Sequence, residues 1–178
     1  LKLAKKKFLA QLIPSQKKLL EAKNIQGESF LSLLLQKGEE ELFFKLHLKH
    51  KFFLQQKNFY KDYGFMTAFF FALQRKDLSL SLRLLDEKSF DYKLEKTKHS
   101  EHFYEALRLE DKNLLKKLME KGFTNFLDDE HKAKAFWLVY EQKNLETFKF
   151  LLENNFPFEG IKENSKLVEK IISSKDYD

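Results

Sequence analysis

Histidines and carboxylates are the side chains of this 178-residue sequence whose spacing could support chemistry. His47 and His50 lie three residues apart, as do His99 and His102, so each pair would share one face of a helix. Two such histidines can begin a zinc site, which closes only with a third or fourth ligand nearby. The carboxylates near them in the sequence are Glu101, Asp128, Asp129 and Glu130. Because these are expected in solvated loops and no His-Glu-x-x-His motif occurs, we predict no metal site.

The acidic run Asp128-Asp129-Glu130 has a simpler interpretation than catalysis, because it precedes an expected helix and favours the positive end of the helix dipole. Paired acid/base catalysis would require one carboxyl with a raised pKa in an apolar pocket. The sequence contains no glycine-rich phosphate loop and no Gly-x-Ser-x-Gly motif, and it has no Cys for a nucleophile, a disulfide or a thiolate zinc site. We therefore nominate no catalytic residue and no cofactor, and expect a protein that is not an enzyme.

The elements that position these residues are predicted by an internal repeat. Three stretches, starting at Ala72, Ala106 and Val139, align at offsets of 34 and 33 residues. A fixed period of this length is typical of stacked helical hairpins. In the best-defined copy Asp111 starts a second helix over Lys112–Lys121, and Gly122 ends it as a left-handed cap. Asn155 takes the Gly122 position in the next copy.

The preceding copy predicts helices over Thr67–Gln74 and Leu78–Glu87, with Lys88 where glycine is expected, so we predict that a different turn forms there or that the copies diverge at this point. The apolar helix faces predict a core that includes the aromatic residues at 43, 69, 103, 136, 140 and 148, together with leucines such as Leu118, Leu151 and Leu152.

The fold class predicted from this pattern is all-α, a solenoid of about four stacked helix-turn-helix hairpins with terminal capping helices, in one domain over residues 1–178. The repeats cover 27–63, 64–97, 98–130 and 131–163. The N-terminal cap covers 1–26 and includes a helix over Gln16–Lys23, and the C-terminal cap covers 164–178. The link from Lys51 to Tyr63 is long for the pattern, which predicts an insertion or an extended turn. Because the chain begins at Leu1 rather than Met, we expect that a preceding segment was removed.

The repeat resembles the ankyrin family over roughly Gly27 to Phe158. Ser29-Phe30-Leu31-Ser32 and Thr67-Ala68-Phe69-Phe70 stand where that family has Thr-Pro-Leu-His, and Ala72 and Ala106 take its small inner position. Leu84–Ser89 and Leu118–Phe123 match its Leu-Leu-x-x-Gly-Ala ending. The tetratricopeptide repeat, which also has a period of 34, is the closest alternative, but its Trp, Gly and Tyr spacing is missing.

The resemblance implies a protein-interaction module that binds a protein partner on the concave side, through turn tips and the exposed face of each first helix. Carried onto this chain, the contact positions are Gln36, Lys37, Gln74, Arg75, Arg108, Leu109, Glu141 and Gln142. Arg75 and Arg108 are the expected hot spots because a guanidinium makes two parallel hydrogen bonds to a carboxylate. Such a ladder spreads contact over a protein-sized partner, so we expect no small-molecule substrate.

The rival hypotheses are a basic nucleic-acid-binding protein and a tetratricopeptide-like adaptor. The net charge is +6, from 33 basic and 27 acidic residues, and the charges are mixed along most of the chain. A single-strand binder would expose aromatic rings beside Lys or Arg, and we expect Phe59-Tyr60-Lys61 and Tyr63 to be such a surface segment. No apolar run is long enough to span a membrane. The composition favours the cytoplasm only slightly.

Overall fold

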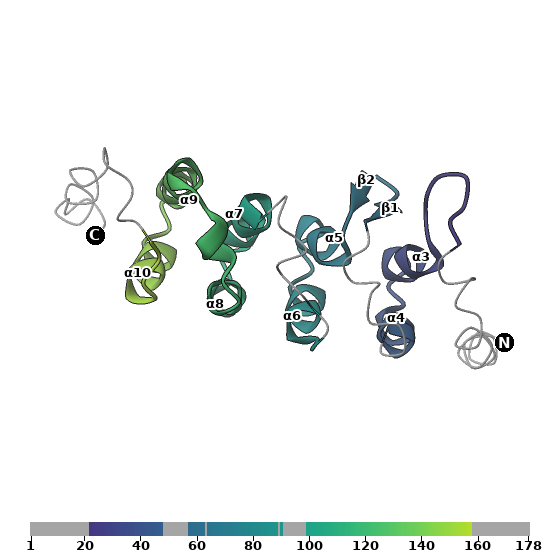
Figure 1. Cartoon of the computed structure of the whole chain (residues 1–178). Helices are drawn as coiled ribbons and strands as arrows, with labels where there is room; N and C mark the ends of the chain where they lie inside the picture. The colour runs from purple at the N-terminus through teal and green to yellow at the C-terminus, as the bar shows by residue number, and fades with distance from the viewer. Residues whose placement is uncertain (1–21, 48–56, 63, 89, 91–98, 158–178) are drawn as a thin grey trace. The chain divides into compact units, whose positions relative to one another are not determined.

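The computed structural model describes residues 22–47, 57–62, 64–88, 90 and 99–157, and these fall into two compact units, unit 1 within residues 1–94 and unit 2 within residues 95–178 (Figure 1). Unit 1 contains α3 (Phe30–Gln36), α4 (Glu40–His47), β1 (Asn58–Tyr60), β2 (Gly64–Met66), α5 (Ala68–Gln74) and α6 (Leu78–Asp86). Unit 2 contains α7 (His99–Leu109), α8 (Lys112–Glu120), the 3-10 helix η4 (Phe123–Phe126), α9 (Asp129–Glu141) and α10 (Leu145–Glu153). The predicted all-α class is confirmed, with one short β-hairpin added.

Each helical hairpin turns at a residue in the left-handed backbone region. Gly38 has φ 70°, Lys76 58°, Glu110 56° and Lys143 52°. The last three are again 34 and 33 residues apart, so the sequence repeat is a repeat of backbone conformation. Only the first of the four is a glycine, although positive φ is unfavourable for residues with a Cβ.

The residue after each of the three non-glycine turns starts the second helix. The side chains of Asp77, Asp111 and Asn144 accept hydrogen bonds from the backbone N–H three residues ahead, at 3.1, 2.7 and 2.9 Å. Such a cap satisfies one of the N–H groups that a helix leaves unpaired at its start. The predicted start at Asp111 is therefore confirmed.

The predicted ends of the second helices are confirmed as well. Gly122 follows α8 with φ 78°, and Asn155 follows α10 with φ 55°. The different turn predicted near Lys88 is also found, because Glu87, the residue that follows α6, is extended, with φ −62° and ψ 127°. A residue with a Cβ adopts that conformation without strain.

Within each unit, like helices are joined to like. In unit 1, Arg75 after α5 donates to the Leu35 carbonyl of α3 at 3.1 Å, and Arg83 of α6 lies over the Phe44 ring of α4 at 3.9 Å. In unit 2, the Tyr104 hydroxyl of α7 donates to the His131 carbonyl of α9 at 3.1 Å. Lys112 of α8 pairs with Glu146 of α10 at 3.0 Å. First helices thus contact first helices, and second helices contact second helices.

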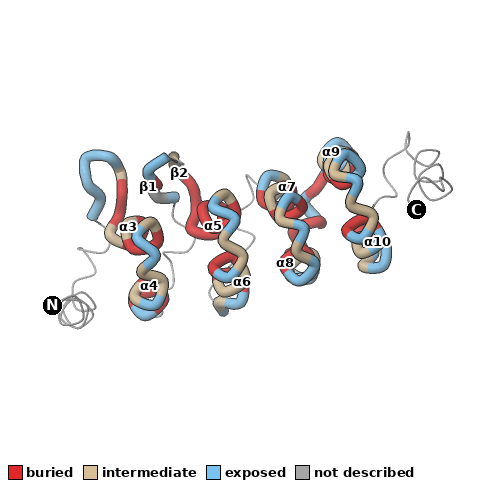
Figure 2. Tube along the Cα trace, turned by 180° about the vertical axis from the view of Figure 1, so that it is seen from behind, coloured by how far each residue is buried: buried red, intermediate tan, exposed pale blue. Residues whose placement is uncertain are grey.

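The core lies between the helices of each unit, on the residues coloured red in Figure 2. All five phenylalanines predicted in the core are buried, at 0 to 5% exposure, and Leu118 and Leu151 are at 0%. The expectation was wrong for Tyr140 and Leu152, which are 40% and 38% exposed.

The long link contains the antiparallel hairpin β1–β2, with Asn58 paired with Met66 and Tyr60 with Gly64. Tyr60 is only 1% exposed, because its ring stacks on Phe71 of α5 with centroids 4.0 Å apart. The expectation of a surface-exposed Tyr60 was therefore wrong, while Lys61 beside it is exposed. Tyr63 lies outside the described residues.

The ends of the chain are described only in part. Lys23 pairs with Ser29 in an isolated antiparallel bridge, so the helix predicted over Gln16–Lys23 does not reach Lys23. The remainder of the predicted N-terminal cap and the predicted C-terminal cap at 164–178 lie outside the described residues. Within the part of the chain that the structure describes, no helix combines the length and apolar character that crossing a membrane requires.

Candidate functional site

The eight predicted contact residues all lie where a first helix ends. Each pair consists of the residues two and one before the left-handed turn of its hairpin, at the ends of α3, α5, α7 and α9. In unit 1 the pairs are Gln36 with Lys37 and Gln74 with Arg75. In unit 2 they are Arg108 with Leu109 and Glu141 with Gln142. The register predicted from the repeat is thus the same in all four hairpins.

Unit 1 gathers three of these residues around an open cleft of about 830 Å³. Its walls come from the turn before α3, the ends of α3 and α5, and the tip of the β-hairpin. The lining residues are Gln26, Glu28, Leu33, Gln36, Lys37, Lys61, Asp62, Phe71 and Arg75. Gln74, the fourth predicted residue of unit 1, is not among them. The size falls within the range of ligand-binding clefts in proteins.

A hydrogen-bond network centred on Glu28 holds one wall of this cleft. The Glu28 side chain is only 8% exposed, and its two oxygens accept from the Asn24 side chain at 2.8 Å and from Gln36 Nε2 at 3.2 Å. Gln36 Oε1 in turn accepts from the backbone N–H of Lys61 at 2.9 Å. Gln36 therefore joins the turn before α3 to the β-hairpin, and its amide positions the wall of the cleft.

Arg75 closes the cleft from α5. Its Nη1 donates to the Leu35 carbonyl at 3.1 Å, and its guanidinium carbon lies 5.4 Å from the centroid of the Phe71 ring. A carbonyl at a helix C-terminus carries partial negative charge, which favours a cation there. The contact fixes the guanidinium at the cleft while its side chain remains exposed.

Two further cations face the cleft from its rim. Lys37 and Lys61 are both exposed, and neither ammonium group pairs with a carboxylate among the described residues. Asp62 is the one lining carboxylate that stands free of the Glu28 network; it has φ 70° at the hairpin tip. The cleft thus presents three cations and two carboxylates, the buried Glu28 and the exposed Asp62, around the apolar side chains of Leu33 and Phe71.

The predicted residues of unit 2 are differently engaged. Arg108 pairs with Glu105 one turn earlier on α7, and its side chain is 46% exposed. Leu109 is half-buried and Glu141 is exposed. The Gln142 side-chain oxygen is buried without a hydrogen-bond partner in the described part of the chain.

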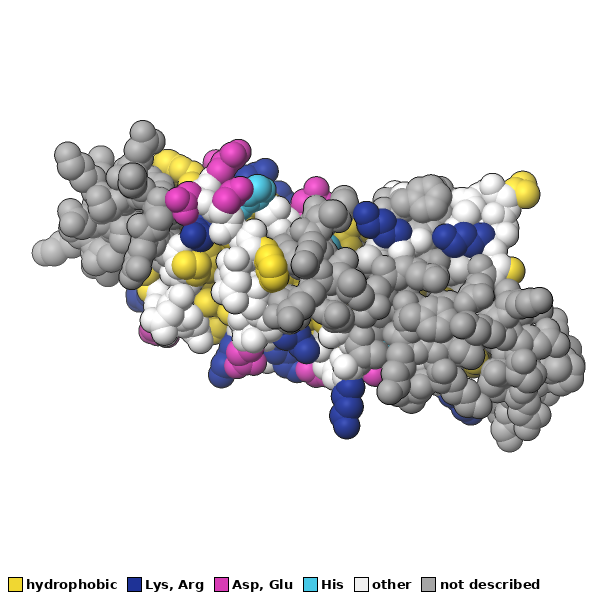
Figure 3. All heavy atoms as spheres, in the orientation of Figure 1, with side chains coloured by type: hydrophobic (Ala, Val, Ile, Leu, Met, Phe, Trp, Pro, Cys, Tyr) yellow, Lys and Arg dark blue, Asp and Glu magenta, His cyan; other side chains and the backbone are white. Residues whose placement is uncertain are grey.

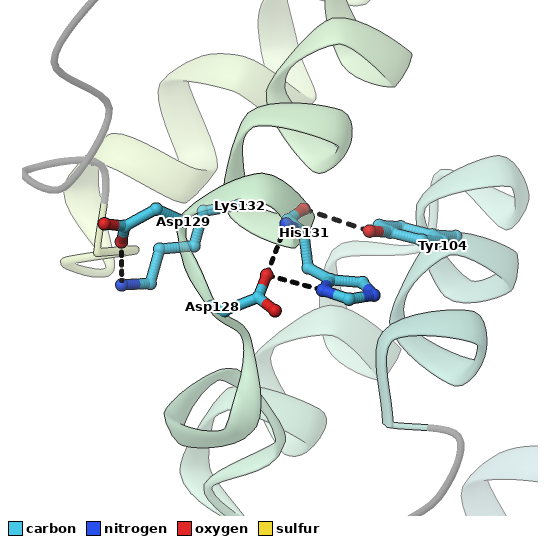
Figure 4. Close-up of polar contacts among 5 residues, drawn as sticks. All are labelled: Tyr104, Asp128, Asp129, His131 and Lys132. Carbon is cyan, nitrogen blue, oxygen red and sulfur yellow. Dashed lines mark hydrogen bonds and ion pairs between the residues drawn. The ribbon is translucent and has the colours of Figure 1, made fainter.

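The acidic run at 128–130 serves the start of α9 (Figure 4). Asp128 Oδ1 accepts from the His131 backbone N–H at 2.8 Å and lies 2.5 Å from His131 Nδ1. The backbone hydrogen bond from His131 lowers the pKa of the Asp128 carboxyl below its usual value. A general acid needs the opposite change, and the predicted role at the helix start is confirmed.

The histidine pairs do not assemble a metal centre in the described residues. His47 is fully buried and stacks against Phe43 with centroids 6.1 Å apart, and His102 is 1% exposed and contacts the Phe123 ring. His50 lies outside the described residues. Among the residues that the structure describes, no three His, Asp or Glu side chains come close enough to hold a metal ion.

Sequence reasoning missed Asn24, Glu28 and Asp62, and it named Lys61 only as part of an expected surface segment. Asn24 lies in the predicted N-terminal cap and Glu28 in the first predicted repeat, and the two meet across the boundary between them. Lys61 and Asp62 lie at the tip of an unpredicted hairpin. A signal for this tip was present in Asp62 and Gly64, two turn-forming residues separated by one position.

Comparison with known proteins gives no relative: no family model matches the chain, and no match was found to a curated protein or to a solved structure.

Proposed function

We propose that this protein is a non-enzymatic protein-interaction module built from ankyrin-like helical repeats, and that it holds a segment of its partner in the cleft of unit 1. One observation carries the proposal. Three residues that the repeat register nominates as partner contacts, Gln36, Lys37 and Arg75, line the same cleft.

The composition of the cleft supports a protein ligand. Its walls combine charged groups with the apolar surfaces of Leu33 and Phe71, and protein interfaces likewise combine apolar contacts with polar ones. Arginine is also enriched among interface hot spots, and the Arg75 guanidinium lies at this cleft beside the Phe71 ring. The solenoid arrangement and the ankyrin-like character of the repeats belong to this proposal, supported by the like-to-like helix contacts within each unit.

A random peptide library displayed on phage tests the proposal with the full chain as bait. Peptides enriched on the wild type are titrated against Lys37→Glu/Lys61→Glu, in which both rim cations are reversed. Lys88→Glu is the matched control, because Lys88 is exposed in unit 1 and does not line the cleft. We expect the double variant to lose binding and the control to keep it. No enrichment, or equal binding by all three proteins, would overturn the proposal.

A second candidate function, binding of single-stranded nucleic acid, is favoured by an observation in unit 2. Trp137 and Tyr140 on α9 are 42% and 40% exposed, with ring centroids 5.5 Å apart, and Figure 3 shows hydrophobic side chains exposed over α9 and α10. The exposed Lys134 lies one turn before Trp137, with its ammonium nitrogen 5.0 Å from the centroid of the Tyr104 ring. Exposed rings beside cations are typical stacking platforms for bases.

The two candidates separate in a fluorescence titration with an oligothymidylate. Stacking on Trp137, the single Trp of the chain, would quench its emission, and the affinity would fall steeply between roughly 50 and 200 mM salt. Binding of a dye-labelled oligothymidylate, measured by the anisotropy of the dye, that disappears in Trp137→Ala would establish the second function. The absence of quenching at low salt would dismiss it.

A further inference from the structure

The charges of the unit 1 cleft are unequally satisfied within the protein. Glu28 is the buried carboxylate of the lining, and both of its oxygens already accept hydrogen bonds from Asn24 and Gln36. Lys37 and Lys61 have no carboxylate partner among the described residues, and Arg75 contacts a backbone carbonyl and an aromatic ring but no carboxylate. A ligand therefore meets three cations that form no ion pair with a carboxylate among the described residues. Two lining carboxylates oppose them, the exposed Asp62 and the buried Glu28, whose charge its neutral amide partners do not remove.

We propose that the segment bound in this cleft is acidic, with carboxylates directed at Lys37, Lys61 and Arg75 and an apolar side chain between them on Leu33 and Phe71. This inference rests on the proposed function, since it names the chemistry of the partner for the same site. Charge complementarity of this kind selects a partner and steers its approach. The Arg75 guanidinium suits a carboxylate in particular, because its planar N–H groups can donate in parallel.

Substitution of Asp62 tests whether the charge of the cleft selects the ligand, because a cleft that only held the fold together would show no gain in affinity. The Asp62 side chain is exposed at the rim, and its positive φ is also tolerated by asparagine, so Asp62→Asn removes one negative charge with little disturbance of the hairpin tip. An acidic ligand should then bind more tightly, by about two- to five-fold, because one exposed like charge is removed. Reversal of both lysines in Lys37→Glu/Lys61→Glu should weaken the same ligand about ten-fold or more.

The charge of the peptides enriched on the wild-type chain is the first measurement. Enriched peptides that carry net negative charge, bind Asp62→Asn more tightly and lose affinity as salt is raised to roughly 0.5 M support the inference. Lys88→Glu is again the control and should bind as the wild type does.

The other outcomes separate the two claims. Enriched peptides that are neutral or basic, yet lose binding in Lys37→Glu/Lys61→Glu, would overturn the acidic partner and leave the proposed function standing. Acidic peptides whose affinity does not rise in Asp62→Asn would also overturn it. If no peptide is enriched, both the acidic partner and the proposed function are overturned. An oligothymidylate that binds the wild type but not the double lysine variant, without any acidic peptide doing so, would assign the cleft to nucleic acid instead.

Discussion

Acidification should destabilise unit 1 through the buried imidazole of His47. The His47 side chain is fully buried at the end of α4 and stacks on Phe43. Burial penalises the charged imidazolium and lowers the pKa of His47 from 6.5 to about 4. In the unfolded chain the same imidazole titrates near its ordinary value, so between these two pKa values the unfolded state binds more protons than the folded state.

The sign and size of the effect follow from those two pKa values. The contribution of His47 to stability is fully present above about pH 6.5 and is lost as the pH falls toward 4. Each factor of ten between the two proton affinities is worth about 1.4 kcal/mol, so the complete loss below pH 4 is about 3 kcal/mol. At about pH 5 the linkage relation gives a loss of about 2 kcal/mol, which is a large share of the stability of a small unit.

Urea denaturation followed by circular dichroism measures this loss in the wild type and in His47→Leu, at about pH 7 and about pH 5. The substitution shifts the stability at both pH values, so the informative quantity is the change between them. We expect the wild type to lose about 2 kcal/mol more than the variant. Equal pH dependence in the two proteins would refute the reasoning and place a charged or solvated imidazole at position 47.

Three further substitutions test the fold in unit 2, where the fluorescence of Trp137 reports unfolding in urea. Leu118→Ala should cost roughly 2–5 kcal/mol because the side chain is 0% exposed, and a loss under about 0.5 kcal/mol would contradict its place in the core. Asp111→Ala should cost about 1 kcal/mol by removing the cap of α8, whereas an unchanged midpoint would mean that water replaces the cap. Lys143→Gly should gain about 0.5 kcal/mol, because glycine relieves the positive φ of 52° but loses more entropy on folding; a clear loss would show that the lysine side chain contributes.

Local signals explain why so much of the helical part could be predicted. Asp111 and Gly122 delimit α8 by backbone requirements that are readable within a few residues, and the same requirements recur one repeat later. Even the failure of the pattern at Lys88 predicted a changed turn, because a lysine has no preference for the left-handed region that glycine adopts freely.

The cleft could not be predicted, because it is formed by contacts between residues that are far apart in the sequence. Gln36 meets the Lys61 backbone across 25 residues, and Tyr60 is buried by stacking on Phe71. Strands of three residues are too short to show the alternation by which strands are recognised. The repeat register placed Lys37 and Arg75 at helix ends, but the hairpin tip that completes the cleft could be found only in three dimensions.

The bond between Arg75 and Leu35 has a consequence for how a ligand docks. One guanidinium nitrogen is committed to the last turn of α3, so an incoming carboxylate can use only the remaining N–H groups and must approach from their side. The entropy of ordering this long side chain is lost during folding and does not recur on association, which preorganises the anchor. A ligand bound in the cleft should also stabilise the contact between the first two hairpins, since Arg75 both binds the ligand and donates to the Leu35 carbonyl.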